Sequence, residues 1–129
     1  MSSIASEVRV PDSPDVIVVG SVNLDTTLRV PHIPQAGETI LSAPRTQAPG
    51  GKGANQAAAA AAVGAAVHFV AAVGDDGVAD VALANLTGFS VDLAHVQRHA
   101  ATPTGAATVI VSDDAENMII VDPGANDRL

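Results

Sequence analysis

An amide and a carboxylate are spaced for hydrogen bonding to a polyol directly after the first apolar run of the chain. The segment reads Gly20-Ser21-Val22-Asn23-Leu24-Asp25. If it is extended, Asn23 and Asp25 project to the same side, because strand side chains alternate. A carboxylate accepts from two adjacent hydroxyl groups, and an amide both donates and accepts. The alternative is a capped turn, in which Asn and Asp are common.

A glycine-rich segment holds the only lysine of the chain, in the sequence Pro49-Gly50-Gly51-Lys52-Gly53-Ala54-Asn55-Gln56. It matches neither common phosphate motif. A Walker A loop has Ser or Thr where Gly53 stands, and the dinucleotide fingerprint has a further glycine where Asn55 and Gln56 stand. Glycines still allow a ligand to approach the backbone, and N–H groups at a helix start favour electronegative atoms. The alternative is a plain flexible linker at residues 50–53.

Alternating strands and helices must position these two segments. Residues 16–19 read Val-Ile-Val-Val before Gly20, a run typical of a strand buried on both faces of a parallel sheet. Further strands are predicted at 28–30 as a short extension, at 67–73, and at 93–98 with less definite character. Helices are predicted at 54–63, ended by Gly64, and at 78–86, opened by Asp75-Asp76.

Two further pieces have a different character. Thr39-Ile40-Leu41 begins an extended piece that continues through Pro44 towards Pro49, so it cannot be a central strand. Residues 108–112 and 117–122 are β-branched runs around Asp113-Asp114-Ala115-Glu116, which predicts a hairpin. The fold class is therefore α/β, a parallel sheet with helices that carries a small β appendage.

The two ends of the chain give weaker signals. Residues 1–14 are polar with two prolines and predict a flexible lead-in. Residues 124–129 are typical of a turn, a helix N-cap and a first helical turn. We therefore expect the sequence to be incomplete; a frayed terminus is the alternative.

Composition and charge exclude several classes of function. The 6 basic and 14 acidic residues give a net charge of −8, which argues against nucleic-acid binding and against a basic membrane-surface helix. Without cysteine the chain has no disulfide or thiolate metal site, and its four histidines show no metal-binding spacing. The N-terminus has no secretory signal pattern and no run is long enough to span a bilayer, so we expect a cytoplasmic location.

The motifs combine into a family pattern. In order, they are VIVVGSVNLD at 16–25, GET at 37–39, GGKGANQA at 50–57, VGDD at 73–76, TG at 104–105 and PGAN at 123–126. From residue 15 to residue 129 the sequence resembles the N-terminal part of the ribokinase branch of the phosphofructokinase-B-type carbohydrate kinases. Pro49 departs from that pattern and affects only the entry to the glycine segment.

The resemblance implies a Rossmann-like domain with a small β-sheet lid, formed by residues of about 38–48 and 106–121, that makes a homodimer contact. It implies transfer of the γ-phosphoryl group of ATP to D-ribose, which gives ribose 5-phosphate, with Mg²⁺ and a monovalent cation such as K⁺. The substrate-binding positions that it implies are Asn23, Leu24, Asp25, Gly51, Lys52, Gly53, Ala54, Asn55 and Ala107.

The same resemblance places the catalytic aspartate in a Gly-Ala-Gly-Asp-type motif beyond these residues, together with the nucleotide and cation sites. No such motif occurs in the 129 residues. We therefore assign no catalytic, nucleotide-binding or metal-binding residue to the chain and expect it to be inactive alone. Two alternatives are a kinase for another sugar or a nucleoside, and a non-catalytic carbohydrate-binding or lid-dimerising module.

Overall fold

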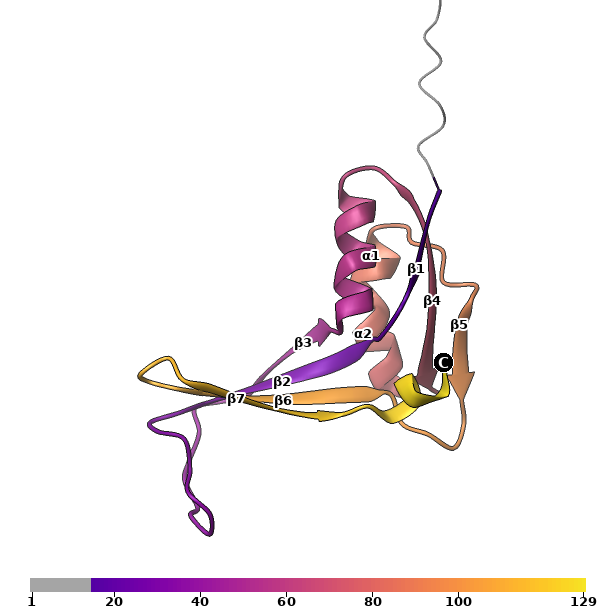
Figure 1. Cartoon of the computed structure of the whole chain (residues 1–129). Coiled ribbons are helices and arrows are strands. Elements are labelled where there is room, and N and C mark those ends of the chain that lie inside the picture. The colour runs from indigo at the N-terminus through magenta and orange to yellow at the C-terminus, as the bar shows by residue number, and fades with distance from the viewer. Residues whose placement is uncertain (1–14) are drawn as a thin grey trace, which may run out of the picture.

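The computed structural model describes residues 15–129; the predicted lead-in at 1–14 lies outside the described residues. The elements in chain order are β1 (Asp15–Val19), β2 (Asn23–Val30), β3 (Thr46–Gly50), α1 (Lys52–Ala62), β4 (Ala66–Gly74), α2 (Gly77–Gly88), β5 (Val96–His99), β6 (Gly105–Ser112), β7 (Asn117–Asp122) and the 3₁₀ helix η1 (Gly124–Arg128). They form two sheets, which confirms the predicted α/β class (Figure 1).

The first sheet is parallel, with strand order β1-β4-β5. Both helices pack on one face of it, against the alternate β4 side chains Val67, Phe69 and Val73 (Figure 1). Leu83 and Leu86 of α2 complete this buried cluster, which is built almost wholly from aliphatic residues. The core therefore lies between the helices and a single face of the sheet.

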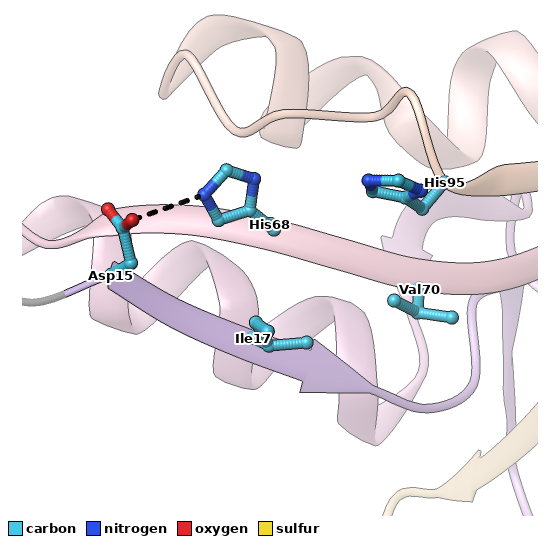
Figure 2. Close-up of a pocket in the computed structure, with 5 residues that line it drawn as sticks. All are labelled: Asp15, Ile17, His68, Val70 and His95. Carbon is cyan, nitrogen blue, oxygen red and sulfur yellow. Dashed lines mark ion pairs between the residues drawn. The ribbon is translucent and has the colours of Figure 1, made fainter.

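The opposite face of this sheet is open, which corrects the prediction that β1 is buried on both sides. Ile17 is 68% exposed and Val19 is 63% exposed. A shallow cavity of about 430 Å³ on this face is lined by Asp15, Ile17, His68, Val70 and His95 (Figure 2). The prediction was wrong because a β-branched run shows that a strand is apolar on both faces, whereas the described helices cover only one.

The second sheet has the strand order β3-β2-β6-β7, with β2 and β6 parallel and both outer pairs antiparallel. Only residues 28–30 of β2 were predicted as strand, yet β2 begins at Asn23 and lies in the middle of this sheet. The predicted extended piece at 39–41 is not a strand; the strand begins at Thr46, after Pro44. Pro49 lies in β3 at the sheet edge, where the N–H that proline lacks is not needed for pairing.

The helix boundaries differ slightly from prediction. α1 starts at Lys52, so residues 50–53 are not a flexible loop: Gly50 ends β3, and Gly51 alone, at φ +95°, makes the turn. At the other end Gly64, at φ +98°, follows the Val63 cap as predicted, and the N–H groups of Gly64 and Ala65 donate to the carbonyls of Ala61 and Ala60.

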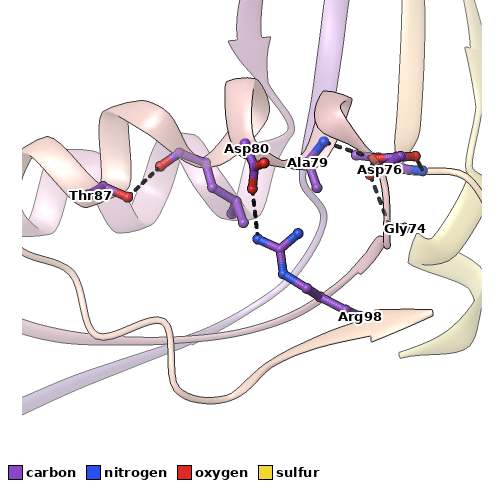
Figure 3. A network of polar contacts seen from close by, with 8 residues as sticks. Gly74, Asp76, Ala79, Asp80, Thr87 and Arg98 are labelled. Carbon is purple, nitrogen blue, oxygen red and sulfur yellow. Dashed lines mark hydrogen bonds and ion pairs between the residues drawn. The ribbon is translucent and has the colours of Figure 1, made fainter. Parts of the chain in front are cut away.

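α2 begins at Gly77, one residue before the predicted start at Val78, and runs two residues past the predicted Leu86, to Gly88. Asp76 caps it by accepting from the Ala79 N–H at 2.9 Å (Figure 3). The same carboxylate accepts from the Thr104 N–H at 3.0 Å and from the Thr104 hydroxyl at 2.7 Å. The Gly74 N–H in turn donates to the Thr104 hydroxyl at 3.0 Å. This network ties the end of β4 to the segment that leads into β6.

The remaining elements are short. β5 is Val96–His99 rather than 93–98. The predicted hairpin at 108–122 is confirmed as β6 and β7, with Ala115 at φ +65° in its turn. Residues 124–128 form the 3₁₀ helix η1, and its N-cap position is Pro123, outside the segment 124–129 in which a turn and an N-cap were predicted. Among the described residues, no helix has the length and apolarity needed to cross a membrane.

Candidate functional site

Three stretches of the chain, 21–25, 51–55 and 107–126, meet at one cavity of about 470 Å³. It lies where the second sheet meets the start of α1. Its lining residues come from the β1–β2 connection and β2, from the start of α1, from β6 and β7, and from the segment after β7: Ser21, Asn23, Asp25, Gly51, Lys52, Asn55, Ala107, Val109, Ile119, Val121, Pro123 and Asn126. Six of the nine predicted substrate-binding residues are in this set.

The start of β2 provides the amide and the carboxylate. Asn23 and Asp25 line the cavity from one face of the strand, as alternation predicts, whereas Leu24 is 8% exposed and faces away from it. The segment is therefore extended, and the alternative of a capped turn is wrong. Leu24 supports the site from the core side and does not line the cavity.

The neighbouring strands provide an apolar wall. Asp25 pairs in register with Ala107 of β6, and Ala107 pairs with Val121 of β7, so the three lie in one row across the sheet. Val109 and Ile119 form a second pair two residues along the same face. Of the four wall residues on β6 and β7, only Ala107 was predicted from the sequence. Strand alternation from Ala107 would have added Val109, and the register of the hairpin would have added Ile119 and Val121.

The start of α1 closes the cavity on a third side. A Cβ at Gly51 would lie 2.7 Å from the Ser21 carbonyl oxygen, so only glycine allows the helix to start this close to β2. Lys52 and Asn55, three residues apart in the first turn, both line the cavity.

Two predicted residues at the start of α1 do not line the cavity. Gly53 packs against the Gly20 backbone, where a Cβ would lie 2.7 Å from the Gly20 Cα. Ala54 is 5% exposed, and its N–H donates to the Ser21 carbonyl at 3.0 Å. Both residues fix the position of the helix start and do not line the cavity.

Asp25 has a buried carboxylate oxygen, Oδ1, that faces no hydrogen-bond donor within residues 15–129. Burial raises the pKa of this carboxyl above its ordinary value of 3.8. An ionised oxygen without a partner is costly to keep buried, so the free cavity favours a ligand that donates hydrogen bonds to it. Hydroxyl groups are such donors.

Asn126 is a cavity residue that the sequence analysis did not propose. Its Oδ1 accepts from the Val22 N–H at 3.0 Å, and its Nδ2 donates to the Val22 carbonyl at 3.1 Å and to Asn23 Oδ1 at 2.9 Å. Asn126 belongs to the quoted PGAN motif, but the motif alone does not reveal a contact with residues more than 100 positions away.

Within residues 15–129, no three His, Cys, Asp or Glu side chains lie close enough together to hold a metal ion. The cavity is suited to a small polyhydroxylated molecule, with acceptor and donor groups on two sides and an apolar wall on the third.

A family model described as pfkB family carbohydrate kinase matches residues 13–129. The chain belongs to this family. Its resemblance to the phosphofructokinase-B-type kinases is thus confirmed, and so is the Rossmann-like fold class with its additional sheet.

Individual relatives of this pfkB-family chain are similar over most of its length. It is 39% identical over 115 residues to a ribokinase from Bacillus subtilis and 35% identical over 112 residues to a deoxyribokinase from Salmonella typhi. A solved structure of Arabidopsis thaliana ribokinase complexed with ribose and ATP is 37% identical, covers 88% of this chain and has a TM-score of 0.80.

The alignments include most of this chain but only a minor part of each relative. These alignments include 89% and 87% of this chain but only 39% and 37% of the two curated relatives, and 37% of the Arabidopsis protein. The chain thus corresponds to less than half of each of them.

Proposed function

We propose that this pfkB-family chain forms the sugar-binding part of an ATP-dependent ribokinase, which transfers the γ-phosphoryl group of ATP to the terminal hydroxyl of D-ribose and yields ribose 5-phosphate. The observation that carries the proposal is the buried, unpartnered Oδ1 of Asp25 beside Asn23 in a cavity of about 470 Å³. The similarity to ribokinases from Bacillus subtilis and Arabidopsis thaliana supports it.

The two kinds of wall match the two sides of a pentose. Hydroxyl groups on adjacent carbons donate to Asp25 and accept from Asn23, Lys52 and Asn55, which replaces their hydrogen bonds to water. The C–H side of the ring packs on the apolar wall, where Ala107 supplies the space beside Asp25. Such contacts fix the sugar's orientation, which is a main protein contribution to phosphoryl transfer.

The proposed reaction also requires ATP, Mg²⁺ and a monovalent cation, and a base that accepts the proton of the attacking hydroxyl. We assign none of these roles within residues 15–129. We expect the chain to bind ribose without phosphorylating it, and we expect the kinase to act in the cytoplasm.

A second sugar is a candidate because the chain is 35% identical to a Salmonella typhi deoxyribokinase. Ribose and 2-deoxyribose differ by one hydroxyl group, and a site whose polar group is left unpaired by the missing hydroxyl discriminates strongly. The unpartnered Asp25 Oδ1 favours the sugar with the additional donor.

Calorimetric titration of the 129-residue chain with D-ribose, 2-deoxy-D-ribose, D-fructose and adenosine tests the proposal. We expect the tightest binding for D-ribose. Tighter binding of 2-deoxyribose, or of fructose or adenosine, would assign the chain to a kinase for that substrate. Absence of binding to all four would contradict a sugar-binding role.

We propose in addition that the far face of the second sheet pairs with a second copy of the chain. Met118 and Ile120 of β7 alternate with the cavity residues and are 46% and 59% exposed. On the same side of the sheet, a groove of about 310 Å³ is lined by Leu28, Ile40 and Ile110, among others. An apolar sheet face of this kind is stabilised when another chain covers it.

Sedimentation measurements on native chain and on Ile120→Glu test this pairing. We expect a dimer for the native chain and a monomer for the variant. Val81→Glu, at a 50% exposed apolar position of α2, is the matched control and should leave the dimer intact. A native monomer would contradict the pairing.

A further inference from the structure

The side-chain amide of Asn126 can adopt only one of its two orientations. Its Oδ1 faces the Val22 N–H at 3.0 Å, and its Nδ2 faces the Val22 carbonyl at 3.1 Å. Turning the amide by half a turn would place an amino group against the N–H and an oxygen against the carbonyl. Because both backbone groups have a fixed polarity, the observed orientation is the one that makes hydrogen bonds.

This fixed amide in turn determines the orientation of a second one. Asn126 Nδ2 also donates to Asn23 Oδ1 at 2.9 Å. Both protons of Asn126 Nδ2 are thereby used, so the Asn23 atom that faces it must be an acceptor. Asn23 lines the cavity, and its Nδ2 makes no hydrogen bond with another residue of the described range 15–129. Its two protons are therefore available to a ligand.

We propose that Asn126 is a positioning residue, which holds Asn23 in the orientation that presents a hydrogen-bond donor to the sugar beside the acceptor Asp25. The inference rests on the proposed function and deepens it. The ligand class that it selects has adjacent hydroxyl groups, one of which donates to the Asp25 carboxylate while its neighbour accepts from Asn23 Nδ2.

The opposite orientation of Asn23 would change the character of the site. Its Oδ1 would then face the cavity beside the Asp25 carboxylate, so both side chains of β2 would present acceptors. Adjacent hydroxyl groups can satisfy two acceptors only if both of them donate. The site would then offer one hydrogen-bond donor fewer to the oxygen atoms of the sugar. The Asn126 hydrogen bond prevents this state.

Gly105 provides the space in which the two amides meet. It pairs in register with Asn23 at the start of β6. A Cβ at Gly105 would overlap both Asn126 Nδ2 and Asn23 Oδ1, the donor and the acceptor of the hydrogen bond between them. A side chain at position 105 is therefore incompatible with the contact, so three elements of the fold are arranged around it.

The test uses Asn126→Asp in the 129-residue chain. One carboxylate oxygen of the variant still accepts from the Val22 N–H. The other takes the place of Nδ2, so it repels the Val22 carbonyl and attracts the Nδ2 of Asn23 instead of its Oδ1. We expect D-ribose affinity to fall by about ten- to hundredfold, the range for an unmatched buried polar group. Asn85→Asp, at an exposed position of α2, is the matched control and should keep native affinity.

A double-mutant cycle separates positioning from general support. If Asn126 acts through Asn23, the Asn126→Asp substitution should have almost no further effect on ribose affinity in a chain that already carries Asn23→Ala. An equal loss of affinity with and without the Asn23 side chain would overturn the positioning role.

A second measurement needs no sugar. By NMR, we expect the side-chain amide protons of Asn23 to exchange freely with water in the native chain and slowly in Asn126→Asp. Fast exchange in both would contradict the proposed reorientation. A native chain that binds no ribose would contradict the proposed function instead, and the exchange rates would still decide the role of Asn126.

Discussion

The Asp25 carboxylate lies against the backbone of Gly50, where any side chain would overlap it. A Cβ at Gly50 would overlap both carboxylate oxygens of Asp25. Gly50 is on β3, the edge strand that pairs with β2, so the glycine segment supports the carboxylate from one side while Ala107 flanks it from the other. The glycine segment therefore serves the site through the missing side chain at Gly50 as well as through Lys52.

Asp25→Asn should weaken ribose binding, because one hydroxyl acceptor is replaced by an amino donor. A mismatched charged hydrogen bond costs about 2–4 kcal/mol, which calorimetry with D-ribose would detect. Unchanged ribose affinity would remove Asp25 from the binding site.

The same substitution should stabilise the free chain at neutral pH. Burial raises the pKa of the Asp25 carboxyl above 3.8, so the folded chain binds its proton more tightly than the unfolded chain. Asp25 therefore lowers the free energy of unfolding as the pH rises from 3.8 through the folded-state pKa. Urea unfolding across this range should show that decrease in native chain and not in Asp25→Asn; identical profiles would contradict it.

Lys52→Ala should weaken ribose binding, because Lys52 lines the same cavity as Asn23 and Asp25. If Lys52 served a nucleotide phosphate instead, the substitution would weaken ATP binding and leave ribose affinity unchanged. Titrations of the native chain and the variant with each ligand distinguish these two results. Arg45→Ala, at an exposed position before β3, is the control that removes one positive charge elsewhere.

Ala107→Leu should block the sugar site with little change in fold. Ala107 is 7% exposed and lies between Asp25 and Val121 in one row of the sheet, so a larger side chain extends into the space proposed for the ring. We expect at least a tenfold loss of ribose affinity, whereas Val109→Leu, two residues along β6, should cost less. Native ribose affinity in Ala107→Leu would place the sugar elsewhere.

Asp76→Ala should destabilise the chain by about 2–4 kcal/mol, since it removes a helix N-cap and two hydrogen bonds to the buried Thr104. Asp80→Ala, which removes the exposed ion pair with Arg98, is the matched control and should cost less than about 1 kcal/mol. Urea unfolding at pH 7 measures both; equal effects would contradict the role of the Thr104 network.

The contribution of Asp76 should also depend on pH in the direction opposite to that of Asp25. Burial raises the pKa of Asp76, but the hydrogen bonds from Thr104 and Ala79, with the charge of Arg98, lower it to a value below 3.8. Its stabilisation is therefore complete above pH 3.8 and is lost as the pH falls through the folded-state pKa. The free energy of unfolding of Asp76→Asn should therefore depend less on pH in the acid range than that of the native chain. Equal pH dependence in the two chains would contradict this role of Asp76.

Some parts of this site follow from local sequence and others do not. Asn23 and Asp25 could be placed because strand alternation is a local rule, and Gly64 and Asp76 because helix ends have local preferences. Residues 23–27 were considered extended but were not predicted to be a strand of the sheet, because their polar side chains are stabilised by two neighbouring strands, β3 and β6, and show no strand pattern of their own.

The role of Asn126 could not be predicted for a related reason. Its three hydrogen bonds reach residues 103 and 104 positions away, and a local pattern carries no information on such distant pairs. The exposure of Ile17 was likewise unpredictable, because a β-branched sequence indicates what a strand face can bury and not what covers it.

The most direct test of the central claim is to locate ribose on the molecule. Two cavities of similar size are available, one lined by Asn23, Lys52 and Ala107 and the other by Ile17, His68 and His95. In an NMR titration of the ¹⁵N-labelled chain with D-ribose, we expect saturable shifts at the first set and none at the second. Shifts at His68 and His95, or no saturable shift at Asn23 and Lys52, would contradict the account.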